Sequence, residues 1–105
     1  MNDDPLQIYA RAKLQSAIEI LATHPGDIRA RLRAAGPDVM LVPHTLVSAN
    51  HVNDDIGWIH KELTQKGNVS ASLHGMRSKR AVSIAERVLL AHAKLNEHIS
   101  HDAGA

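Results

Sequence analysis

Apolar residues recur at helical spacing along most of the chain, and short breaks rich in proline and glycine separate these segments. Pro5 is typical of the first position of a helix, and Asp3 or Asp4 can serve as its N-cap. His24-Pro25-Gly26 should end this helix, because a residue before proline avoids the helical region. We therefore predict a first helix over residues 4–23. Its expected inner positions are Leu6, Ala10, Leu14, Ala17, Ile18 and Leu21.

A second helix is predicted over residues 27–36, in the sequence DIRARLRAAG. Asp27 can cap its start. Gly36 followed by Pro37 is a typical helix end, since proline cannot continue the hydrogen-bond ladder. The expected inner positions are Ile28, Leu32 and Ala35.

The stretch over residues 37–50 is ambiguous. Its VMLV segment has the composition of a short strand, but the chain offers no second strand to pair with it. We favour a buried turn or a short helix, broken at Pro43.

A third main helix follows, and either Asn50 or Asn53 can cap it. Its apolar stripe has successive spacings of four, three and four residues, which is the pattern of one helix face. Lys66-Gly67-Asn68 should end the helix. The stripe consists of Val52, Ile56, Ile59 and Leu63.

Two further helices complete the chain. Ser70 or Ser72 can open a short helical turn through Leu73 and Met76, and Ser78 can cap the last and longest helix. The expected inner positions of that long helix are Ala81, Ile84, Ala85, Val88, Ala91 or His92, Leu95 and Ile99.

These segments predict an all-α, compact single domain over residues 1–105, with three main helices and two short ones and with residues 1–3 and 101–105 frayed. Tyr9 and Trp58 are the only aromatic residues, so aliphatic side chains must form the core. A core of this size is marginal, and we therefore hypothesise a homodimer.

Composition narrows the functional classes. There is no cysteine, which excludes a disulfide scaffold and thiolate chemistry. The N-terminal region lacks the apolar core of a signal peptide, and no apolar run approaches the ~18 residues of a membrane span, so we expect a cytoplasmic protein. The formal net charge is only +1, well below the excess of cations typical of non-specific nucleic-acid binding.

Three stretches carry a resemblance to a known group. AIEILATHPGDIRARL at residues 17–32 resembles an Ala-Thr-x-x-Gly-Asp-[Ile/Val]-Arg-x-Arg-Leu pattern, and DDIGWIHKELTQKG at 54–67 and MRSKRAVSIAERV at 76–88 resemble later blocks of the same group. The group consists of small uncharacterised helical bacterial proteins. The resemblance implies a shared fold, a cytoplasmic setting and an association with phages or mobile elements, and it implies no activity.

Two clusters of cations are the main candidates for a binding surface. Positive charge at the start of the last helix is unexpected, because the free N–H groups there favour anions. These side chains either extend into water or hold an anionic partner. A second cluster lies in the body of the predicted second helix, and a shared side of the fold would favour a polyanion. The candidates are Arg77, Lys79, Arg80 and Arg87 in the first cluster and Arg29, Arg31 and Arg33 in the second.

Two specific nucleic-acid hypotheses are weaker. The short helix, Gly75 and basic helix have the loose shape of a helix-turn-helix, but the last helix has the apolar content of a core helix. Arg87-x-x-x-x-His92 matches the loose motif of HEPN ribonucleases. Residues five apart on one helix are ~140° apart, however, so these side chains should diverge.

The histidines do not form a convincing metal site. His98 and His101 with Glu97 and Asp102 form the best cluster, while His51 and Asp55 lie one turn apart. Zinc sites normally need three or four convergent ligands, so we predict neither a metal nor a cofactor.

Trp58 lies at the edge of the apolar stripe of its helix, ~100° from Ile59. It should pack over the Lys66-Gly67 turn, or it can be half exposed and anchor a partner. We therefore expect a non-catalytic binding module whose partner is a protein, with a nucleic-acid binder as the alternative and a HEPN-like ribonuclease as a remote one.

Overall fold

The computed structural model describes residues 5–43 and 50–104, and within these ranges the chain forms five α-helices and no strand. The prediction of an all-α fold is confirmed. The helices are α1 (Pro5–Thr23), α2 (Ile28–Met40), α3 (Asn50–Leu63), α4 (Val69–Leu73) and α5 (Ser78–Gly104).

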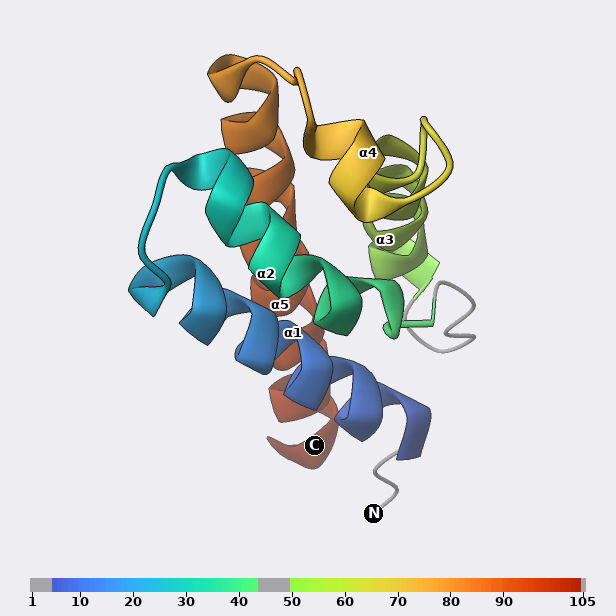
Figure 1. Cartoon of the computed structure of the whole chain (residues 1–105). Helices are drawn as coiled ribbons and strands as arrows, with labels where there is room; N and C mark the ends of the chain where they lie inside the picture. Colours follow the sequence, from blue (N-terminus) through green and yellow to red (C-terminus); the bar gives the residue numbers. More distant parts are fainter. Residues whose placement is uncertain (1–4, 44–49, 105) are drawn as a thin grey trace.

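The long helix α5 is the centre of the arrangement (Figure 1). It packs against α1, α2 and α3, and α2 and α3 also contact each other directly. The short helix α4 contacts both α2 and α3 and closes the remaining gap between them. A helix covered on three sides needs a wide apolar face, which α5 supplies with many small and branched aliphatic residues. Its buried positions are Ala81, Ile84, Ala85, Val88, Ala91 and Leu95.

The predicted inner faces agree closely with the buried residues in α3 and α5. All four stripe residues of α3 are fully buried. In α1 the prediction was wrong at one position, since Leu6 is 52% exposed and Gln7 is buried in its place. Gln7 continues the alternating three- and four-residue spacing of Ala10, Leu14 and Ala17, whereas Leu6 lies at the edge of this face, ~100° from Gln7.

The predicted end of the second helix at Gly36-Pro37 was wrong, because α2 continues through Pro37 to Met40. The clash that disfavours a helical residue before proline involves that residue's Cβ, which Gly36 lacks. Burial of Val39 then holds the last turn in place, and its carbonyl oxygen lies 3.0 Å from Nε2 of His60. The first part of the ambiguous stretch is therefore helical, as one of the two preferred alternatives anticipated.

Three predicted caps also differ from the structure. Asn53 lies inside α3, which begins at Asn50. Asn68, rather than Ser70 or Ser72, caps α4 by accepting a 2.7 Å hydrogen bond from the amide of Ala71. An asparagine with extended backbone at that position reaches the free amide three residues later. The Ser72 hydroxyl is buried instead, and it accepts a hydrogen bond from the Lys66 amide.

At the start of α5, Ser78 is the first helical residue and not the cap. The Arg77 carbonyl accepts the first bond, from the Ala81 amide at 3.1 Å. The helix is continuous from Ser78 to Gly104. Three predictions lie outside the described residues and side chains. They are the cap at Asp3 or Asp4, the structure of residues 44–49 and the inward position of Ile99.

Candidate functional site

Two buried carboxylates on α3 determine where two of the candidate arginines lie. Asp55 and Glu62 are seven residues apart, which is two turns, so they share one side of α3. Arg80 donates to Glu62 and Arg87 donates to Asp55 at 3.1 Å. These two arginines therefore have anionic partners within the protein, so α3 balances part of the positive charge of α5.

Lys94 completes this α3–α5 seam. It is seven residues after Arg87 and donates to the second Asp55 oxygen at 2.8 Å. The Asp55 side chain is 8% exposed, and its two cations are 38% and 36% exposed. Each pair thus joins a buried anion to a cation that still reaches water, an arrangement that limits the desolvation cost.

Trp58 belongs to the same seam. It is half-buried against the core, and the Arg87 guanidinium lies 4.6 Å from its ring centroid. This distance is within the range of a cation–π contact. The indole therefore packs against the core and contacts α5 through Arg87.

Arg31 has a different structural role. Its Nε donates to the Gly26 carbonyl at 3.0 Å, and its Nη1 donates to the Leu21 carbonyl at 3.4 Å. The last carbonyls of a helix have no partner within the helix, so Arg31 satisfies groups at the end of α1. The α1–α2 connection itself requires Gly26, which has a φ of +107°.

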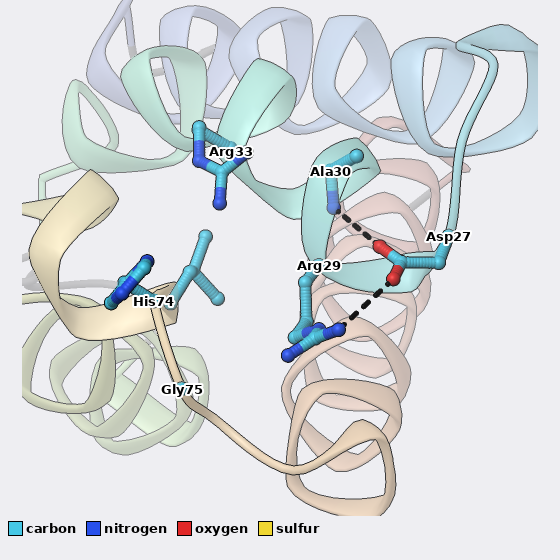
Figure 2. Close-up of a pocket in the computed structure, with 7 residues that line it drawn as sticks. Asp27, Arg29, Ala30, Arg33, His74 and Gly75 are labelled. Atoms are coloured by element: carbon cyan, nitrogen blue, oxygen red, sulfur yellow. Dashed lines mark hydrogen bonds and ion pairs between the residues drawn. The ribbon is translucent and has the colours of Figure 1, made fainter.

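The other two arginines of α2 line a pocket with a volume of about 450 Å³ (Figure 2). Arg29 and Arg33 come from one face of α2, and His74 and Gly75 come from the end of α4 and the turn after it. Arg29 donates to the Met76 carbonyl at 3.2 Å, so α2 is bonded directly to the segment that leads into α5.

Asp27 is the acidic residue in the wall of this pocket. Its Oδ1 accepts a bond from the Ala30 amide at 3.0 Å, and its Oδ2 lies 3.3 Å from Nη2 of Arg29. The hydrogen bond from the Ala30 amide, and then the bond from the Arg29 guanidinium, lower the pKa of Asp27 below its usual value. The carboxylate is therefore ionised at neutral pH and already occupied as the cap of α2.

A second, shallower depression of about 350 Å³ adjoins the start of α5. Arg77 and Lys79 line it together with Arg80 and Ser83. Both Arg77 and Lys79 are exposed, and neither side chain bonds to another described residue. Arg33 is likewise exposed without an ion pair to the described part of the chain.

The two predicted clusters therefore come together only in part. We define the basic end as Arg29, Arg33, Arg77 and Lys79, because the turn at Gly75 that lines the first pocket leads directly to Arg77 in the second. Arg31 is bonded to the end of α1, and Arg87 is directed toward α3. Sequence reasoning missed His74 and Gly75, which carry no local signal. It also missed the role of Asp55 and Glu62, whose seven-residue spacing matches that of Arg80, Arg87 and Lys94.

The structure bears on the two specific nucleic-acid motifs. Arg87 bonds to Asp55 on α3, whereas burial and then the positive charge of Arg11 on α1 lower the pKa of His92. The helix that a helix-turn-helix would insert into a groove is α5, and its apolar face is covered by α1, α2 and α3.

Among the described residues, no group of three or more histidine, aspartate or glutamate residues is placed to hold a metal ion. No helix in the same ranges is long and apolar enough to cross a membrane. Comparison of the chain with protein-family models, with curated proteins and with solved structures gives no match.

Proposed function

We propose that this protein is a non-catalytic helical binding module that binds an acidic segment of a partner protein through its basic end. The proposal rests on a difference between two groups of cations: some bond to other groups of the fold and others do not. Arg31, Arg80, Arg87 and Lys94 bond to carbonyls or carboxylates of the fold. Arg33, Arg77 and Lys79 have no such partner among the described residues and extend into solvent at one end of the molecule.

The number of available cations favours a protein over nucleic acid. Proteins that bind duplex DNA often neutralise about six to ten phosphates, whereas the basic end has four cations, one of which already bonds to Asp27. A short acidic segment matches this smaller charge. The resemblance to small helical bacterial proteins suggests a regulator or inhibitor from a phage or mobile element, acting in the cytoplasm.

The test is binding of a fluorescent glutamate-rich peptide, measured by anisotropy at about 50 mM and about 200 mM salt. We expect salt-sensitive binding that the triple variant R33E/K79E/R77E abolishes. The control R11E/K13E reverses two charges on α1, away from the basic end, and should retain the binding that the double variant R77E/K79E loses. Circular dichroism verifies that these variants fold.

Single-stranded and duplex nucleic acid are measured in parallel. Failure of the peptide to bind at low salt would overturn the proposal. Tighter binding of nucleic acid than of peptide, lost in the same triple variant, would replace it with the nucleic-acid alternative.

The homodimer remains a separate prediction, for which exposed Val82, Leu89 and Leu90 on α5 provide apolar surface. Light scattering of the purified chain would give its mass.

A further inference from the structure

The pocket between α2 and α4 has features that the rest of the basic end lacks. Its volume of about 450 Å³ falls in the range of pockets that hold small ligands or single side chains. Three residues with nitrogen-bearing side chains line it, and Figure 2 shows Arg29 and Arg33 on α2 and His74 at the end of α4. The depression at the start of α5 is open and offers mainly flexible side chains.

The position of Arg29 is fixed before any ligand arrives. Its Nη1 donates to the Met76 carbonyl and its Nη2 to Asp27, which uses two of the five N–H donors of the guanidinium. The remaining donors are held in a rigid plane at the wall of the pocket. A donor that is already oriented loses less conformational entropy on binding than a mobile side chain does.

Arg33 is four residues after Arg29 and so lies on the same face of α2. It supplies a second guanidinium, and its exposed side chain has no ion pair to the described part of the chain. His74 adds an imidazole N–H, which donates in either charge state. With Asp27 counted, the pocket has a formal charge of +1 when His74 is neutral, because two arginines outweigh one carboxylate.

The packing of α2 on α4 holds the walls in place. Gly36 lies so close to Val69 that a Cβ built on it would be 2.7 Å from a Val69 methyl group. Leu73, which also lines the pocket, is fully buried. Gly75 has a φ of +81°, a conformation that favours glycine and that turns the chain after His74. The pocket is thus formed by the fold itself.

We propose that this pocket binds one phosphate monoester group. Two guanidinium groups and an imidazole provide more donors than a carboxylate can accept from one side, and they suit the three terminal oxygens and the charge near −2 of a phosphate monoester. The group can come from a phosphorylated side chain of the acidic partner segment or from a free small phosphate ester. The proposal rests on the proposed function, since it names the chemistry that the basic end selects.

The experiment compares four probes by calorimetry: phenyl phosphate and three versions of one acidic peptide with serine, phosphoserine or glutamate at a central position. We expect the phosphoserine peptide to bind about tenfold more tightly than the glutamate version. We also expect phenyl phosphate to shift the backbone amide signals of Arg33, His74 and Gly75 in NMR spectra. Phenyl phosphate binding without peptide binding would assign the free small ester as the source.

Arg33 is the residue to vary, because it is exposed and makes no bond on which folding depends. R33A should lose about tenfold in affinity for the phosphoserine peptide, and R33K should lose part of that, because lysine lacks the planar fork. K79A is the matched control, since Lys79 belongs to the basic end but not to the pocket. It should lose less than about threefold, as an exposed charge does.

The outcomes separate the pocket from the proposed function. Suppose that the phosphoserine and glutamate peptides bind equally and that R33A loses no more affinity than K79A. This result would overturn the phosphate site and would be consistent with an acidic partner. Binding of phenyl phosphate in the pocket without binding of any peptide would overturn the acidic partner and leave the pocket standing. Absence of binding by all four probes would overturn both.

Discussion

The Asp55 carboxylate and the Lys94 ammonium are 39 residues apart in the chain and 2.8 Å apart in the structure. With Arg87 on the other carboxylate oxygen, they join α3 to α5 at a buried position. Because Glu62 bonds to Arg80 at the other end, the two helices run antiparallel with one register. The cations of α5 thus select the position of α3 along the central helix.

Removing the buried anion should weaken this seam. We expect Asp55→Asn to lower the free energy of unfolding by about 1–3 kcal/mol, because the amide is uncharged and its NH2 group cannot accept one of the two hydrogen bonds. Urea unfolding followed by circular dichroism measures it. The neighbouring exposed Asp54 is the matched control, and Asp54→Asn should change stability by less than about 0.5 kcal/mol. Equal effects of the two substitutions would contradict a role for the seam in stability.

Replacement by alanine should have opposite effects on stability at Gly36 and at Gly57, because only Gly36 is closely packed against another residue. A methyl group at Gly36 would meet a Val69 methyl at 2.7 Å, so Gly36→Ala should destabilise the protein by about 1–3 kcal/mol. At Gly57 nothing lies within 4 Å of the added Cβ, so Gly57→Ala in α3 should stabilise by up to about 1 kcal/mol. Thermal unfolding of the two variants measures the sign of each effect.

A rescue experiment identifies the cause at Gly36. V69A removes the opposing methyl groups, so Gly36→Ala made in the V69A background should cost much less unfolding free energy than Gly36→Ala made in the original sequence. Additive effects of the two substitutions would show that the cost at Gly36 arises elsewhere.

Arg31 and Arg33 allow a paired test of the division of cations between the fold and the surface. Arg31→Ala removes the bonds to the Leu21 and Gly26 carbonyls and should cost about 1 kcal/mol of unfolding free energy. Arg33→Ala, on the same helix, should change it by less than about 0.5 kcal/mol. Chemical denaturation measures both. A larger loss at Arg33 than at Arg31 would reverse the assignment.

The pKa shift of His92 predicts a pH dependence of stability. Burial and the charge of Arg11 lower the pKa of His92 in the folded state, so the unfolded chain binds a proton more readily. The stabilising contribution is therefore fully present above the usual histidine pKa of about 6.5 and is lost as pH falls through the folded value. Unfolding midpoints measured downward from about one pH unit above that pKa should fall less steeply with pH in His92→Gln. An unchanged slope would assign the dependence to other groups.

Local periodicity by itself determined the helical class of this protein and most of its core. The stripe of Val52, Ile56, Ile59 and Leu63 is buried as predicted, because three- and four-residue spacing places side chains on one face of a helix whatever its neighbours. Breaks at His24-Pro25-Gly26 and around Gly67 lie between helices as expected, since proline and glycine act on their own backbone.

The tertiary structure decided what those faces and cations meet. Local rules end a helix at Gly36-Pro37, but α2 continues to Met40 because Val39 is buried and Gly36 approaches Val69. In the sequence, Arg80 and Arg87 look like two arginines on one helix face that could bind a ligand. In the structure their partners are carboxylates on α3. The partner of a charged side chain depends on which helices lie beside it, and that follows from the packing of the whole chain.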